Sequence, residues 1–420
     1  MADLTITVTC RSLTPMFVGF DQEEPELDAQ PVTAMLRWWV RALAGTCCFN
    51  ELQQVKLLEE AIFGSQRRAS AVRVDVDCAD PPLLLPAGAA VGNGVAYLGG
   101  QGVIARQGQA WLTARAALQP QPFTIRLCGR NWEVKIAYAA LLLAARFDGL
   151  GARKRKGFGA FAVTAVHGAR PDWPSAIIPE QPNLRTDIAW ASEQMDRFRA
   201  LLVRRHQEDP RANPDHHRLA LSYPTTETST YPALRNCRAY WFRLPAAADG
   251  LAALQSVGQW IYTLRRVGGR PGTIRGIIHT VDYDAVVAPV LGGDLPGDPR
   301  FDIFGLPIPY KNSQKQEARL SWRLPGASDA DEKAYGAGEE KRRASPVILT
   351  LRHAGEHWLL SLYLDQSAFL PAGAEEIITT GGRAATVPWA DTGATPPPFI
   401  QALALQMPTA NRPPVAIYTP

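Results

Sequence analysis

Apolar and polar residues alternate along three short segments of the chain, at 4–10, 70–78 and 160–167. In the first of these, Leu4, Ile6, Val8 and Cys10 alternate with threonines. A period of two is typical of a β-strand with one buried face, because successive side chains of a strand point to opposite sides. We therefore predict strands at all three places.

Longer segments show the spacing of helices. The segment PVTAMLRWWVRALAG (31–45) has Pro31 near its start and Gly45 as a stop, as amphipathic helices often do. Further helices are predicted at 136–147 and 188–206. The apolar stripe of the first helix consists of Met35, Leu36, Trp39, Val40 and Leu43. Arg37 and Arg41, four residues apart, share one edge of that stripe.

A proline-rich stretch, ARPDWPSAIIPEQPN (169–183), shows no clear period and predicts a boundary between two domains. We expect an N-terminal domain at 1–168, a linker at 169–184 and a C-terminal domain at 185–420. The C-terminal domain carries a polar, charged insertion at about 311–342, which we expect to be a flexible loop.

The two halves repeat a motif. IFGSQRRASAVRV (62–74) has a counterpart in two pieces, IFGLP (303–307) and RRASPVILTL (342–351), separated by the charged insertion. In both halves a segment carrying Trp and Arg precedes the motif, and an apolar strand follows it. This repetition favours an internal duplication.

Charge and cysteine content narrow the functional classes. The net charge is only +4, so affinity for nucleic acid would come from local clusters and not from the whole field. The six cysteines form no C-x-x-C pair, which indicates a reduced chain. The N-terminus lacks the pattern of a signal peptide, and the apolar stretch 136–145 is too short to span a bilayer. We expect a soluble cytoplasmic protein that does not enter the membrane.

Four consecutive cations, Arg153 to Lys156, lie among four glycines in the segment GLGARKRKGFGAF (149–161). Arginine can clamp a phosphate with two donors, and glycines let main-chain N–H groups approach phosphate oxygens. We therefore interpret the segment as an RNA-contacting loop, with Phe158 and Phe161 either stacking on bases or anchoring it. A solvated hairpin turn is the plainer alternative.

The motifs LRWWVRAL, IFGS with RRAS, GARKRKGFGAF, IFGLP and RRASP, in this order, resemble the RAMP superfamily of CRISPR systems. The subunit-one family of the type III-B Cmr effector complex is the most similar. This resemblance implies an α+β fold with two ferredoxin-like (RRM-like) domains in tandem, with loop insertions. It also implies a non-catalytic RNA-binding subunit of an RNA-guided complex in antiviral defence. Its expected partners are guide RNA (crRNA, at the 3′ region), target RNA and other Cmr-type RAMP subunits.

Two groups of residues are predicted to bind RNA. The first group consists of Arg37, Arg41, Arg67, Arg68, Gly151, Arg153, Lys154, Arg155, Lys156, Gly157, Phe158 and Gly159. A second basic site is possible at Arg265, Arg266, Arg270, Arg275, Arg342 and Arg343. A helix end with a glycine cap explains the segment 263–276 equally well.

Other chemistries fit the sequence less well. The basic glycine segment lacks the spacing of a Walker A loop or of a dinucleotide fingerprint, so no cofactor is expected. No metal site is expected either, because His353 and His357 flank a predicted hairpin turn, and His216 and His217 are predicted on a polar loop. The main alternative is a RAMP-type, metal-independent endoribonuclease that processes guide RNA, for which His279 is the least unfavourable catalytic residue. A second alternative is a structural cap that binds only neighbouring protein subunits.

Overall fold

The computed structural model falls into two compact units, which are described separately. The first comprises Met1–Gln259, Ile348–Asp365 and Asn411–Pro420, and the second Trp260–Val347 and Gln366–Ala410. The structure describes residues 3–19, 23–47, 52–78, 81–100, 102–177, 184–211, 214–220, 234, 237–265, 308–311, 317–323, 347–354, 356–365, 375–380, 383–386 and 415–418. The predicted division into tandem domains at 169–184 stays a prediction.

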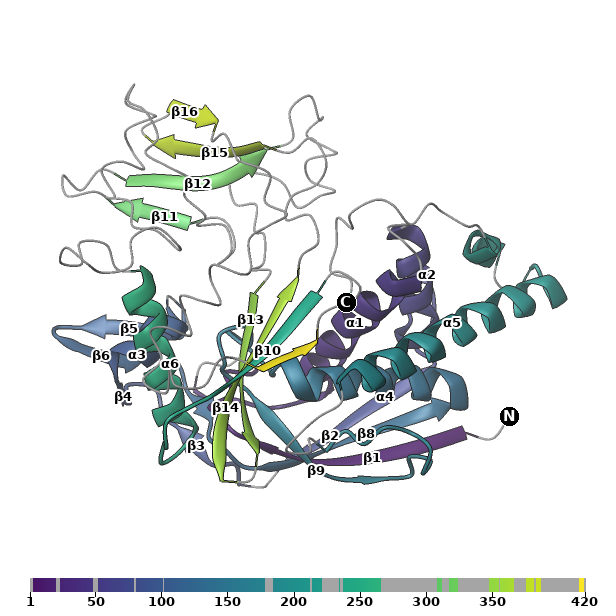
Figure 1. Ribbon diagram of the computed structural model, residues 1–420, viewed down its shortest axis with the longest axis horizontal. Coiled ribbons are helices and arrows are strands. Elements are labelled where there is room, and N and C mark those ends of the chain that lie inside the picture. Colours follow the sequence, from purple (N-terminus) through teal and green to yellow (C-terminus); the bar gives the residue numbers. More distant parts are fainter. Residues whose placement is uncertain are drawn as a thin grey trace. The chain divides into compact units, whose positions relative to one another are not determined.

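The first unit contains an antiparallel sheet with the order β2-β8-β1-β9 (Figure 1). Its strands are β1 (Asp3–Ser12), β2 (Val72–Cys78), β8 (Pro122–Arg130) and β9 (Phe161–His167). The three strands predicted from alternation are thereby confirmed. Helices α1 and α2 lie between the first two strands and α4 between the last two, so this order is consistent with a ferredoxin-like unit.

Helices α1 and α4 cover one face of this sheet (Figure 1). The helices of this part are α1 (Ala29–Cys47), α2 (Leu52–Phe63), α4 (Asn131–Phe147) and α5 (Leu184–Glu208). All five residues of the predicted apolar stripe of α1 are at most 1% exposed. The three predicted helices are thus confirmed, whereas the sequence reading had not identified α2.

A second sheet of the same unit has the order β13-β14-β10-β17. Its strands are β10 (Cys237–Arg243), β13 (Val347–Ala354), β14 (His357–Asp365) and β17 (Val415–Tyr418). Helix α6 (Gly250–Arg265) follows β10 in the chain and begins in the first unit. If the four strands of each sheet are numbered as they occur along the chain, the spatial order in both sheets is second, third, first, fourth. The second strand is β2 in the first sheet and β13 in the second sheet, so these two strands correspond. This is the correspondence that the RRAS repetition predicts, since RRAS precedes each of these strands in the sequence. The expected α+β class with antiparallel sheets is confirmed.

The remaining elements lie in insertions. Between β2 and β8 are β3 (Leu84–Leu85), β4 (Ala90–Val91), α3 (Asn93–Gly99), β5 (Ile104–Gln107), β6 (Ala110–Thr113) and β7 (Ala117–Leu118). A 3₁₀ helix, η1 (Pro214–Ala220), follows α5. The second unit contains a sheet of β11 (Ile308–Lys311), β12 (Glu317–Arg323), β15 (Glu375–Thr380) and β16 (Arg383–Thr386).

One expectation about the charged insertion is wrong in part. Within 311–342, expected to be a flexible loop, residues 317–323 form strand β12, which pairs with β11 and β15. Alternating apolar residues in EARLSWR give this segment the period of a strand.

The helices that the structure describes include none with the length and apolar character needed to span a membrane.

A buried arginine joins the two sheets of the first unit. Arg352 of β13 is fully buried and donates hydrogen bonds to the main-chain oxygens of Ala144 (3.1 Å), Arg146 (3.0 Å) and Asp148 (2.8 Å). Ala144 and Arg146 lie in the last turn of α4 and Asp148 directly follows it, so Arg352 caps the carboxyl end of this helix. Burial lowers the pKa of Arg352 to about 9, so the guanidinium stays protonated at neutral pH.

Candidate nucleic-acid interface

The segment Gly149–Phe161, called the basic loop from here on, connects α4 to β9 and is closed by its own backbone. Gly149 and Ala160 form a β-bridge, and the N–H of Leu150 donates to the oxygen of Gly159 at 2.9 Å. The loop is therefore a hairpin-like turn, as the plainer interpretation expects.

Residues 14–17, which follow β1, form hydrogen bonds with this hairpin. The N–H of Ala152 donates to the oxygen of Phe17 at 2.8 Å, and that of Gly159 to the oxygen of Pro15 at 2.9 Å. The hydroxyl of Thr14 donates to the oxygen of Gly157 at 2.8 Å. Because the N–H of Gly159 already has a protein acceptor, it does not contribute to the expected phosphate nest.

The two phenylalanines anchor the loop in the core. Phe158 is 1% exposed and contacts Phe17 edge to face at 5.4 Å between ring centroids. Phe161 is fully buried and contacts Phe123 at 5.9 Å. Of the two roles considered for these rings, anchoring fits the geometry, since a buried ring offers no face to a base.

The far side of the loop pairs with the second sheet. The N–H of Leu349 in β13 donates to the oxygen of Arg155 at 3.1 Å, and Leu349 forms a parallel bridge with Lys156. The basic loop therefore extends the edge of the second sheet, and both sheets of the unit fix its position.

The four cations have different environments. Arg153 is exposed, and at φ +60° it is the one non-glycine residue with positive φ among the described residues. The guanidinium of Arg155 lies 5.1 Å from the ring centroid of Trp38, a cation–π contact. Lys154 forms an ion pair of 2.6 Å with Asp148, whose side chain is 1% exposed. Asp148 was not predicted as a site residue, although it directly precedes the first glycine of the loop.

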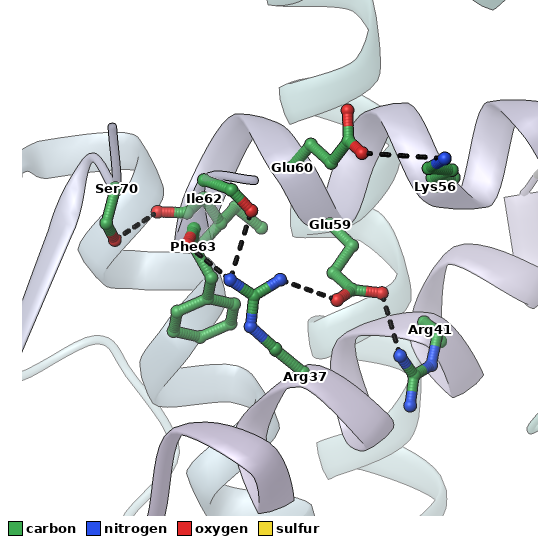
Figure 2. Close-up of polar contacts among 9 residues, drawn as sticks. Arg37, Arg41, Lys56, Glu59, Glu60, Ile62, Phe63 and Ser70 are labelled. Carbon is green, nitrogen blue, oxygen red and sulfur yellow. Dashed lines mark hydrogen bonds and ion pairs between the residues drawn. The ribbon is translucent and has the colours of Figure 1, made fainter. Parts of the chain in front are cut away.

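Arg37 and Arg41 are directed to α2 and not to the basic loop (Figure 2). Both pair with Glu59, at 2.7 Å for Arg37 and 3.0 Å for Arg41. Arg37 also donates to the main-chain oxygens of Phe63 (2.5 Å) and Gly64 (3.0 Å), at the end of α2. The structure thus gives Arg37 a structural task, in which it fixes the packing of α1 against α2.

Arg67 and Arg68 lie at the opposite end of the first sheet from the basic loop. Both arginines precede β2 in the chain. The first residue of β2 pairs with Gly129 near the end of β8, and the end of β8 pairs with the start of β1 at Asp3. The basic loop instead leads into the start of β9, which pairs with Ser12 at the other end of β1. Ten residues of strand span about 30 Å, so the residues grouped from the sequence are not one continuous patch.

Arg68 also contacts a buried histidine. Its guanidinium lies 3.3 Å from Nε2 of His216, which is only 3% exposed, contrary to the expectation that this histidine lies on a polar loop. Burial, followed by the charge of Arg68, lowers the pKa of His216 to about 4. His216 is therefore neutral at pH 7, and among the described residues its Nδ1 has no hydrogen-bond partner.

Several predicted residues cannot be placed. Arg266, Arg270, Arg275, Arg342, Arg343 and His279 lie outside the described residues, as does the side chain of Arg265. His353 and His357 flank the turn between β13 and β14, as predicted. Within the part of the chain that the structure describes, no three His, Cys, Asp or Glu side chains cluster as metal ligands.

The sequence of this chain is similar to a known protein family. The RAMP superfamily matches residues 9–162, a range that contains β2, β8 and the basic loop. Two curated relatives come from Pyrococcus furiosus. The CRISPR system Cmr subunit Cmr1-2 is 41% identical over 70 residues, which are 16% of this chain and 37% of the relative. Cmr subunit Cmr1-1 is 26% identical over 188 residues, which are 43% and 51% of the two chains. The matches thus span about half or less of these relatives.

One solved structure supports the fold, and a second structure has a lower TM-score. A chain of the type III-B Cmr-beta complex bound to cognate target RNA matches with a TM-score of 0.50 and 11% identity, over 96% of this chain and 100% of that one. Apo Cmr1 from Pyrococcus furiosus matches with a TM-score of 0.48 and 13% identity, over 99% and 98%. The resemblance seen in the motifs is confirmed: residues 9–162 match the RAMP superfamily, and the chain is similar to Cmr1 subunits of CRISPR systems.

Proposed function

We propose that the protein is a non-catalytic RNA-binding subunit of a type III-B CRISPR effector complex in the cytoplasm. In that complex it would contact guide RNA, in the 3′ region, or target RNA, next to other Cmr-type RAMP subunits. The names of its relatives support the assembly, and the basic loop supports the contact with RNA.

The observation that carries the proposal is the way in which the basic loop presents its charge. Main-chain hydrogen bonds to Pro15, Phe17 and Leu349 fix the backbone of the loop, while Arg153 is exposed at its tip. A loop fixed in this way loses little conformational entropy when it binds, so its side chains are organised in advance for a phosphate backbone. A turn that is only solvated would not need hydrogen bonds from both the segment after β1 and strand β13 to fix its backbone.

Ultraviolet crosslinking of the purified protein to guide RNA, with and without target RNA, followed by mass spectrometry, tests the contact. We expect crosslinked peptides from the basic loop, and their response to target RNA shows which strand is bound. Crosslinks confined to peptides outside residues 149–161 would contradict the assignment.

A non-catalytic role is proposed because no acid-base constellation is visible in the sequence around the basic loop. Incubation with labelled guide-RNA precursor, with and without Mg²⁺, should leave the RNA intact. Cleavage that disappears in a His279→Ala variant would instead support the guide-processing endoribonuclease.

A further inference from the structure

A buried carboxylate lies directly beneath the basic loop. The Asp148 carboxylate accepts three hydrogen bonds, from Nζ of Lys154 (2.6 Å), Nε1 of Trp39 (3.0 Å) and the N–H of Gly149 (2.9 Å). Of these three donors, only Lys154 carries a full charge. A carboxylate removed from water is costly unless it is paired, so the burial of Asp148 favours keeping Lys154 at its side.

We propose that Asp148 is the positioning residue of the basic loop, and that Lys154 is the tether through which it acts rather than a phosphate contact. For its effect on RNA, this inference rests on the proposed function; for the conformation of the loop it stands independently. Because the charge of Lys154 is matched by Asp148, the phosphate contacts of the loop come from Arg153, Arg155 and Lys156.

The tether acts in the middle of a strained turn. Lys154 follows Arg153, whose φ of +60° costs an L-residue about 1–2 kcal/mol. The turn closes through the N–H of Lys156, which donates to the oxygen of Arg153 at 2.8 Å. Such a conformation persists only where its surroundings hold it. The ion pair between Lys154 and Asp148 is a side-chain contact that holds this turn, beside the hydrogen bond from the Thr14 hydroxyl to the oxygen of Gly157.

Asp148 also accepts hydrogen bonds from the second sheet. Its main-chain oxygen accepts from Arg352 (2.8 Å) and from the hydroxyl of Thr350 (3.1 Å), both in β13. The carboxylate and the carbonyl of one residue therefore connect the loop, the end of α4 and the second sheet. This position explains why an acidic residue is found beside a run of cations that would bind RNA.

Native-state trypsin digestion and RNA titration of four variants test the proposal. Lys154→Met and Asp148→Asn remove the tether, Lys154→Arg keeps it, and Arg153→Gln is a matched control that removes one exposed charge. Trypsin is suited to the loop because it cleaves after arginine and lysine. We expect cleavage after Arg155 and Lys156 to be at least about fivefold faster in the two tether variants, and close to the parent rate in the others.

The salt dependence of RNA binding separates a tether from a phosphate contact. Arg153→Gln should lower the slope of log affinity against log salt by about 0.7, whereas Lys154→Met should leave that slope unchanged. Parental cleavage rates in both tether variants, or a slope lowered equally by Lys154→Met and Arg153→Gln, would overturn the proposal. If Asp148→Asn does not fold, Lys154→Met still decides the question. A parent that binds no RNA would overturn the proposed function, while the trypsin result would still decide the tether.

Discussion

The guanidinium of Arg352 donates a 2.8 Å hydrogen bond to the main-chain oxygen of Asp148, 204 residues earlier in the chain. This contact joins β13 of the second sheet to the end of α4, which packs on the first sheet. The carboxylate of the same Asp148 pairs with Lys154 of the basic loop. Asp148 thus contacts both the second sheet, through its main-chain oxygen, and the basic loop, through its carboxylate.

Arg352→Met should lower the free energy of unfolding by about 2 kcal/mol, because the buried, charged guanidinium donates to three main-chain oxygens at once, and these hydrogen bonds are lost. Arg352→Lys should recover little of this loss, since one ammonium cannot reach acceptors that the planar guanidinium bridges. Urea denaturation measures both variants. Parental stability of Arg352→Met would show that these hydrogen bonds do not join the sheets.

Gly159→Ala should destabilise the protein more than Gly108→Ala. Both glycines have positive φ, +64° and +59°, so each substitution costs about 1 kcal/mol in backbone strain. At Gly159 a Cβ would also lie 1.9 Å from the oxygen of Leu150, whereas nothing lies within 4 Å at Gly108. Thermal unfolding compares the pair, and equal melting temperatures would argue against the closed hairpin.

Arg37→Met should reduce stability by about 1–3 kcal/mol and leave RNA binding unchanged, because its donors already have acceptors in Glu59, Phe63 and Gly64. Arg41→Gln is the matched control, with a single ion pair and a side chain that is 43% exposed. Denaturation and RNA titration are run on the same samples. A lower salt slope in Arg37→Met would place this arginine on the RNA after all.

The stability of the protein should depend on pH through His216. Its pKa is about 4 in the folded state, against 6.5 for an ordinary histidine, so between these values the unfolded chain binds a proton that the folded chain does not. The free energy of unfolding should therefore fall as the pH is lowered from 6.5 to about 4. His216→Gln cannot titrate and should flatten this dependence, whereas His217→Gln, at an exposed position, should keep it. A parental pH profile in His216→Gln would contradict the assignment.

The sequence predicted local structure well where the signal was local. Periods of two and 3.6 located β1, β2 and β9 and the helices α1, α4 and α5, and the density of charge among glycines singled out the basic loop. The repeated RRAS motif correctly anticipated that β13 corresponds to β2.

What the sequence did not predict depends on partners that are distant along the chain. Glu59, the partner of Arg37 and Arg41, lies on α2, which had not been recognised as a helix. The role of Asp148 depends on Lys154 and on Arg352, and no periodicity links these positions. The separation of Arg67 and Arg68 from the basic loop follows from strand register, which becomes visible only when the sheet is built.

The salt dependence of RNA binding tests the central claim most directly. The triple variant Arg153→Ala, Arg155→Ala, Lys156→Ala keeps the tether at Lys154, and a control replaces the exposed Arg197, Arg204 and Arg211 with alanine. Both variants lose three charges. If the basic loop binds phosphates, the triple variant should bind guide RNA more weakly and its salt slope should fall by about 2, which is about 0.7 for each lost contact. The control should keep the parental slope. Equal affinity and equal slope in the triple variant and the parent, at every salt concentration, would show that the basic loop is only a solvated turn.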